Sequence, residues 1–177
     1  MPARVRFVFS RKKEVMRALL IVESCFGNTK TIAEAIAAGM EESGAQVQIA
    51  RVDTAAQDVL ATIDLLILGA PTHNRGLSTT ATRRKAAAAG AVHSQTGMRE
   101  WLDGVVLAAP DPMVAAFDTG SGRGRLSGSA ATSIARLLAR RGISCRTKAF
   151  VVGGVQGPLA PGEIEKAKDW GRTLIRD

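Results

Sequence analysis

Short apolar runs alternate along the chain with longer segments in which apolar residues recur at helical spacing. A continuous apolar run at 18–22 and the largely apolar segment 63–69 predict buried strands, and shorter runs at 113–117 and 150–152 predict two more. Residues 47–52 alternate apolar and polar positions, which is typical of a half-buried or edge strand. The pattern therefore predicts five strands.

Amphipathic helices are predicted between most of these strands. One begins near Thr29 and ends before Gly44, and further helices cover 98–104 and 130–138. A last helix opens at Glu163, after a Pro-Gly pair. Residues 78–92 show only weak periodicity and predict a loop that begins a helix. Alternating strands and helices predict a single α/β domain, in which three layers surround a doubly wound parallel sheet.

Ligands of such sheets bind outside the carboxyl ends of the strands, where the strand order reverses direction. The segments that follow the predicted strands at this edge are 23–29, 70–78, 118–128 and 153–162. These four loops are the expected location of a binding site.

The loop at 23–29 reads ESCFGNT and has the chemistry of an anion site. Ser24 and Thr29 supply hydroxyl groups, Gly27 permits a tight backbone, and Asn28 can fasten the turn with its side chain. The helix that follows offers unpaired N–H groups, which can hold a phosphate without a lysine. The loop is neither a Walker loop nor a GxGxxG loop. An ordinary capped helix start would also use Ser and Thr, so the loop alone leaves both interpretations open.

Four blocks of the sequence resemble the flavodoxins. The block ALLIVESCFGNTKTIAEAI at 18–36 resembles their FMN-phosphate signature. DLLILGAPTH at 64–73 and AFDT at 116–119 resemble the segments that lead to the two loops beside the flavin ring. GPLAPGE at 157–163, with Trp170-Gly171, resembles the last loop and helix of flavodoxin-domain proteins common in actinobacteria. The blocks occur in the family's order, and together the resemblance extends over residues 17–177.

The resemblance implies a flavodoxin-like sheet with strand order 2-1-3-4-5 and FMN bound without a covalent bond. Carried over position by position, it implies three groups of FMN contacts. The phosphate would be held by Ser24, Cys25, Phe26, Gly27, Asn28 and Thr29; one side of the ring would face Pro71, Thr72, His73 and Asn74; and the pyrimidine edge would meet Asp118, Thr119 and Gly120. No catalytic residue and no metal ligand is expected.

The chain departs from this family in its aromatic residues. Most electron-transfer flavodoxins stack a Trp or Tyr on the flavin, whereas this chain has no Tyr. The loops expected beside the ring contain no aromatic residue apart from His73, which either contacts a flavin or faces solvent. Trp101 and Trp170 lie on predicted helices and are expected in the core. Weak FMN binding, or its loss, is therefore one expectation.

Two cysteines, Cys25 and Cys145, lie far apart in the sequence and are expected to be reduced thiols. Cys25 precedes a helix N-terminus, where the pKa of a thiol can fall. The alternative interpretation is a loop residue that contributes its N–H group. Cys145 is expected to be a small core filler. Asp118 either accepts a hydrogen bond from a flavin edge or caps its own loop.

Charge sets this chain apart from classical flavodoxins, which are acidic. The net charge is +8, and residues 1–16 carry +4 of it. That basic extension has three interpretations: an upstream start with Met16 as the true initiator, a disordered tail, or a functional arm. The domain itself is expected to span 17–177. Arg75, Arg123 and Arg125 flank the expected ligand mouth and either steer an anionic ligand or are ordinary surface arginines.

The predicted function is that of an FMN-binding electron-transfer protein in the cytoplasm, whose redox partner would present an acidic surface. No apolar run approaches the roughly 18–20 residues needed to span a bilayer, and no signal peptide is recognised. Two alternatives stay open: an FMN-dependent NAD(P)H oxidoreductase of the quinone reductase type, and a flavin-free interaction domain with the same fold. Nucleic-acid binding is suggested only by the high pI and is not expected. The sequence leaves the oligomeric state open.

Overall fold

The computed structural model describes residues 15–55, 62–107, 112–122 and 128–176. Five parallel strands form one sheet in the order β2-β1-β3-β4-β5. The strands are β1 (Arg17–Val22), β2 (Gln46–Arg51), β3 (Leu65–Pro71), β4 (Met113–Gly120) and β5 (Arg146–Val151). This order confirms the predicted topology.

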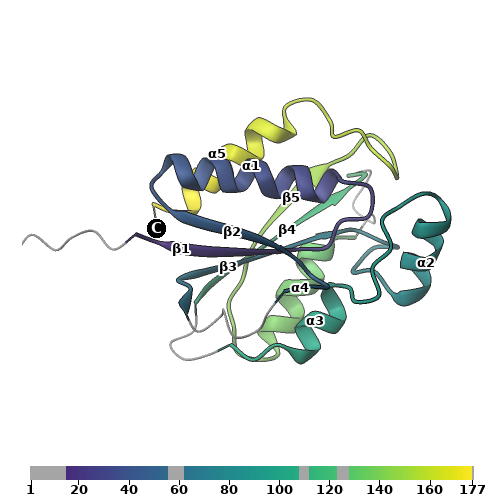
Figure 1. The fold of residues 1–177 in the computed structure, drawn as a ribbon, viewed down its shortest axis with the longest axis horizontal. Coiled ribbons are helices and arrows are strands. Elements are labelled where there is room, and N and C mark those ends of the chain that lie inside the picture. Colours follow the sequence, from purple (N-terminus) through teal and green to yellow (C-terminus); the bar gives the residue numbers. More distant parts are fainter. Residues whose placement is uncertain (1–14, 56–61, 108–111, 123–127, 177) are drawn as a thin grey trace, which may run out of the picture.

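Five helices accompany the sheet: α1 (Asn28–Glu42), α2 (Thr80–Ala88), α3 (Met98–Gly104), α4 (Ala130–Ala139) and α5 (Glu163–Leu174). Figure 1 shows α1 and α5 on one face of the sheet and α3 and α4 on the other. α2 lies beyond the carboxyl ends of the strands, away from both helical layers (Figure 1). The predicted three-layer arrangement is therefore confirmed, with α2 as an addition at one edge.

The strict alternation of strand and helix predicted from the sequence is wrong in two connections. Two helices, α2 and α3, lie between β3 and β4, and the described part of the β2–β3 connection contains no α-helix. α2 has the sequence TATRRKAAA, whose apolar residues are all alanines. Alanine favours a helical backbone, but its small side chain produces almost no hydrophobic stripe along the helix. The hydrophobic periodicity of residues 78–92 is therefore weak.

Two strand boundaries also differ from the predicted ones. β5 begins at Arg146, four residues before the predicted apolar run, because its first half is an exposed sheet edge with polar side chains. β4 extends to Gly120, two residues past Asp118, where a loop was predicted to begin. Arg123 and Arg125 lie outside the described residues, as does the N-terminal extension up to residue 14.

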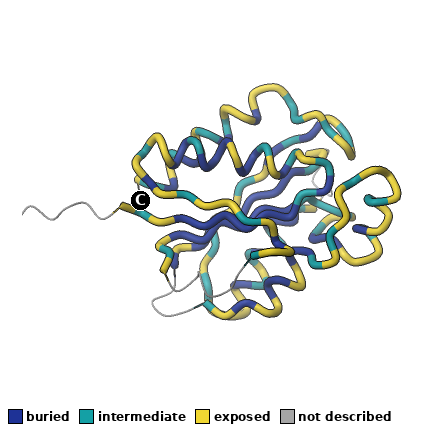
Figure 2. Tube along the Cα trace, in the orientation of Figure 1, coloured by how far each residue is buried: buried dark blue, intermediate teal, exposed yellow. Residues whose placement is uncertain are grey.

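The core divides into two clusters, one on each face of the sheet. Figure 2 shows the central strands between them as buried. Side chains alternate along each strand, so Leu19 and Ile21 pack toward α3 and α4 while Leu20 and Val22 pack toward α1 and α5. The three central strands are buried on both faces, as their continuous apolar runs predicted. None of the described helices has both the length and the apolar content that a membrane span requires.

Both tryptophans lie in this core, as predicted. Trp101 packs in the cluster beneath α3. Trp170 lies in the opposite cluster, where its ring meets Phe117 and Phe150 edge-on with centroids 6.4 and 6.2 Å away. Neither indole lines the cavity at the carboxyl ends of the strands.

Helices α1 and α5 approach each other closely through two glycines. A Cβ on Gly39 would overlap the carbonyl oxygen of Lys168, and a Cβ on Gly171 would overlap that of Ile36. Each glycine therefore lets the backbone of the other helix come within contact distance.

We expect Gly39→Ala to lower the free energy of unfolding by about 2 kcal/mol, because the two helices must separate to admit the methyl group. This loss opposes the gain of about 1 kcal/mol that alanine normally brings to a helix. Urea denaturation measures it, with Glu41→Ala on the exposed side of α1 as the control. An unchanged or raised midpoint for Gly39→Ala would contradict the close packing.

Candidate functional site

A cavity of about 400 Å³ opens at the carboxyl edge of the sheet. The residues expected from the sequence to hold a ligand supply much of its lining: Cys25, Phe26, Asn28, Thr29, Pro71, Thr72, His73, Asn74, Thr119 and Gly120. Three expected residues, Ser24, Gly27 and Asp118, do not line it. The fold thus brings the loops after β1, β3 and β4 together around one hollow.

The loop after β1 presents a row of main-chain N–H groups. α1 begins at Asn28, preceded by Gly27 in the left-handed conformation at φ 91°, and no side chain caps this position. Ser24 Oγ accepts the N–H of Lys30 at 3.2 Å. No acceptor for the five N–H groups of residues 25–29 is found within the described parts of the chain. This donor set, at the positive end of a helix, suits an anion.

Contacts on two sides hold this loop in place. Thr29 Oγ1 lies 2.8 Å from Thr119 Oγ1, which joins the loop to the end of β4. The Asn28 side-chain amide donates to the carbonyl oxygen of Gln156 at 3.0 Å, which joins it to the segment after β5. Gly157 makes this approach possible, since a Cβ there would lie 2.7 Å from Asn28 Oδ1. The donors are therefore fixed in position before any ligand arrives.

His73 and Cys25 meet across the cavity wall, with Nε2 and Sγ 3.6 Å apart. A tight turn presents His73: its N–H and carbonyl pair with Gly76, and Asn74 and Arg75 adopt φ of 42° and 72° between them. Burial lowers the pKa of His73. Burial, and then the negative charge of Glu23, raises the pKa of the Cys25 thiol to about 11. Both side chains are therefore neutral at pH 7.

The interpretation of Cys25 as a low-pKa thiol is wrong. Burial is the largest cause of the raised pKa of Cys25, the charge of Glu23 adds to it, and the charge of Arg83 opposes both. Burial also raises the pKa of Cys145 to about 11. Cys145 packs against the core on the α3–α4 side, in keeping with its expected role as a filler.

Asp118 is buried and turned toward the start of α4. Its Oδ2 accepts hydrogen bonds from Ser129 Oγ at 2.5 Å, from the N–H of Ala131 at 3.1 Å and from Thr72 Oγ1 at 3.2 Å. The carboxylate thus joins β4 to the N-terminus of α4 and to the loop after β3. Of the two roles expected for it, these contacts belong to the capping role.

The sequence did not identify α2 as a wall of the cavity. Thr82, Lys85, Ala86 and Ala89 line it from this side. Their spacing of 3, 4 and 7 residues from Thr82 places them on one face of the helix. The available signal was at the helix start, where Thr79 and Thr82 form a reciprocal cap through their side chains and N–H groups.

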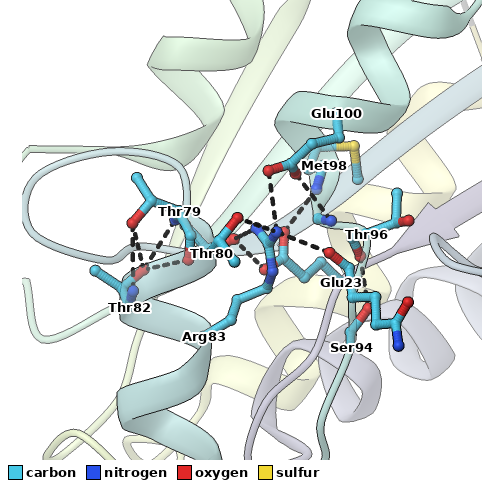
Figure 3. A network of polar contacts seen from close by, with 12 residues as sticks. Glu23, Thr79, Thr80, Thr82, Arg83, Ser94, Thr96, Met98 and Glu100 are labelled. Atoms are coloured by element: carbon cyan, nitrogen blue, oxygen red, sulfur yellow. Dashed lines mark hydrogen bonds and ion pairs between the residues drawn. The ribbon is translucent and has the colours of Figure 1, made fainter.

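A buried polar network anchors α2 to the end of β1 (Figure 3). Glu23 and Arg83 are only 2% and 3% exposed. Arg83 Nη1 donates to Ser78 Oγ at 2.9 Å, and Ser78 Oγ donates in turn to Glu23 Oε1. Glu23 Oε2 accepts the N–H of Met98 at 2.8 Å.

The other terminal nitrogen of Arg83 reaches the segment between α2 and α3. Nη2 donates to the carbonyl oxygen of Gln95 and to Glu100 Oε1, both at 3.0 Å. This ion pair lowers the pKa of Glu100 against the opposing effect of burial. Arg83 therefore ties together the base of the loop after β1, the start of α2 and the start of α3.

The sequence matches a family model, and the fold matches solved structures. The sequence model of the family described as "Flavodoxin domain" matches residues 19–83. No curated protein matches the sequence.

Three solved structures illustrate the similarity in fold. A flavodoxin from the domain Archaea is 19% identical, with 91% of this chain and 97% of that chain covered at a TM-score of 0.59. Oxidised Flavodoxin 2 from Bacillus cereus is 20% identical, with coverage of 90% and 98% and a TM-score of 0.63. The flavodoxin of Streptococcus pneumonia TIGR4 is 15% identical, with coverage of 90% and 98% and a TM-score of 0.64. At these identities the likeness establishes the fold.

We expect Arg83→Met to lower the free energy of unfolding by about 3 kcal/mol, because it leaves buried acceptors of the network without their charged donor. Chemical denaturation measures the loss. Arg84→Met, at the exposed neighbouring position, is the matched control and should change stability by less than about 0.5 kcal/mol. Equal effects of the two substitutions would mean that the network does not stabilise the fold.

The raised pKa values predict that both thiols of the folded protein resist alkylation by iodoacetamide at pH 8. In the unfolded chain thiols ionise near pH 8.5, whereas Cys25 and Cys145 keep their protons until the pH nears 11. The stability that these protonated thiols contribute is present below about pH 8.5 and is lost as the pH rises toward 11. Peptide mass spectrometry resolves the two sites, with the guanidinium-unfolded chain as control. Rapid labelling of native Cys25 at pH 8 would contradict its raised pKa.

Proposed function

We propose that this chain, which contains a flavodoxin-like domain, binds FMN in the cavity at the carboxyl edge of its sheet and acts in electron transfer. The observation that carries the proposal is the row of five N–H groups at residues 25–29, which lies at the N-terminus of α1. A phosphate monoester carries the negative charge and the acceptor oxygens that such a row suits. The donors therefore fit the phosphate end of FMN.

The remaining residues of the cavity lining have the mixture of apolar and polar groups that a flavin ring and its ribityl chain require. Phe26 and Pro71 offer apolar surface, while Thr72, Asn74 and Thr119 offer polar groups within the same hollow. Aromatic side chains among the described lining residues are limited to Phe26 and His73. A ring bound here would accordingly gain less from stacking than one held between tryptophan and tyrosine.

FMN, when bound, would supply the electron-accepting and electron-donating chemistry. The chain's own residues would bind and orient it. Residues 25–29 would hold the phosphate, and the loops after β3 and β4 would confine the rest. His73 and Cys25, both neutral at pH 7, would place no charge beside the ligand.

The electron partner should carry an acidic surface. The chain has a net charge of +8, and no carboxylate belongs to the described lining of the cavity. Opposite charges steer association between proteins, so an acidic partner would approach this chain fastest at low salt. A cytoplasmic location suits the reduced thiols.

A flavin-free interaction domain is the second candidate, favoured by the scarcity of aromatic lining. An FMN-dependent NAD(P)H oxidoreductase is the third. The sequence carries no nicotinamide-binding signature in its favour, so steady-state oxidation of NAD(P)H in the presence of FMN is the observation that would support it.

FMN binding to the apo-protein, followed by quenching of flavin fluorescence, tests the proposal. We expect affinity in the micromolar range or tighter, and about a tenfold loss in Thr29→Ala, because a hydrogen bond to a charged group contributes about 1.5–3 kcal/mol. Thr173→Ala is the matched control, since the Thr173 hydroxyl donates to the carbonyl of Trp170 within α5 at 2.7 Å and lies outside the cavity lining. Absence of binding at tens of micromolar FMN would favour the flavin-free domain.

A further inference from the structure

We propose that Lys85 of α2 supplies a cationic contact to the phosphate group of the bound flavin, so that α2 makes the site selective for FMN over riboflavin. This inference rests on the proposed function and adds a residue that the resemblance to flavodoxins does not provide.

The helix geometry aims Lys85 at the cavity. Thr82, Lys85, Ala86 and Ala89 form one face of α2, and all four line the hollow. Arg84 and Lys85 are both exposed to solvent, but Arg84 does not line the hollow. Two adjacent cations on one helix therefore have different surroundings, and only Lys85 belongs to the cavity wall.

Hydrogen bonds place the C-terminal end of α2 beside the expected phosphate site. Gln156 Nε2 donates to the carbonyl oxygen of Ala89 at 3.3 Å, while the carbonyl oxygen of Gln156 accepts from Asn28 at 3.0 Å. Just past the helix, the N–H of Val92 donates to the carbonyl oxygen of Cys25 at 3.0 Å. Lys85 lies about one helical turn before Ala89, within reach of the same end of the cavity for a side chain of its length.

No other formally charged side chain belongs to the described lining. Lys85 also makes no ion pair with any residue that the structure describes. The nearby buried carboxylate, Glu23, already accepts two hydrogen bonds in the network of Arg83. The ammonium group of Lys85 therefore remains available to a negatively charged ligand.

The Arg83 network gives this contact its fixed geometry. Arg83 holds the start of α2 to Ser78 and to the segment before α3. With α2 anchored in this way, little of the helix has to be ordered when the ligand binds, which preserves affinity.

Lys85 also lies in the last turn of α2, where a cation stabilises the negative end of the helix dipole. That purely structural role would lower stability slightly in Lys85→Ala but would not distinguish one ligand from another. Selectivity between a phosphorylated and a non-phosphorylated flavin is therefore the readout that separates the two roles.

The experiment compares the dissociation constants of FMN and riboflavin for the wild type, Lys85→Ala and Arg84→Ala, at low and moderate salt. Lys85→Ala should weaken FMN binding about fivefold, the size of a solvent-accessible ion pair, and change riboflavin binding less than about twofold. The salt dependence of FMN binding should also become shallower in Lys85→Ala. Arg84→Ala, which removes the same charge next to it, should leave the ratio of the two constants unchanged.

Two results would overturn the inference while the proposed function stands. In the first, the wild type binds FMN, but Lys85→Ala and Arg84→Ala change its dissociation constant equally. In the second, Lys85→Ala weakens the binding of FMN and of riboflavin by the same factor. A wild type that binds neither flavin would remove the proposed function itself. Urea denaturation of the three proteins confirms that each is folded at the assay temperature.

Discussion

The pairing of β1 with β3 in the middle of the sheet is the constraint on which the site depends. From this pair the chain runs one way through α1 to β2 and the other way through β4 to β5, so the loops after β1 and β3 diverge and leave a crevice between them. The parallel register then brings the end of β4 to the same edge, where Ala70 lies opposite Asp118 and Pro71 opposite Thr119. Three loops that are distant in sequence therefore line one cavity, and the binding site is a consequence of strand order before any side chain is considered.

Burial of charge at this edge determines which loops are rigid. Glu23 follows the end of the central strand β1 and is almost fully buried. A buried carboxylate is stable only if hydrogen-bond donors surround it. The donors to Glu23 are the hydroxyl of Ser78 and the N–H of Met98, and Arg83 in turn donates to Ser78. All three residues belong to the long connection between β3 and β4. The same contacts that satisfy Glu23 therefore hold α2 against the loop after β1, and they fix the wall that carries Lys85.

The apolar runs of the central strands predicted the α/β class and the loops around the cavity, while the strand order and the individual lining residues came from the resemblance to flavodoxins. The sequence could not reveal α2 as a wall, because TATRRKAAA has no apolar stripe and its role comes from its position beyond the sheet. Arg83, Arg84 and Lys85 form a uniform basic run in the sequence. Only the fold shows that Arg83 is a buried anchor and that, of the two exposed cations, Lys85 lines the cavity. The raised pKa of Cys25 could not be predicted from the sequence either, because its main causes are burial and the charge of Glu23, which depend on the fold.

The scarcity of stacking aromatics changes how this site can obtain affinity. Stacked rings bind a flavin through its apolar faces, a contribution that salt barely affects, whereas N–H donors and a lysine act on its phosphate through charge. Alanines at 86 and 89 leave the α2 wall shallow, so the ring gains little contact there to replace a tryptophan. In the proposed complex, more of the affinity would therefore come from the phosphate end of the ligand, at the loop after β1 that Thr119 and Gln156 hold in place. Under the proposed function, a flavin would therefore be held mainly by its phosphate, and its ring would gain little from the described lining.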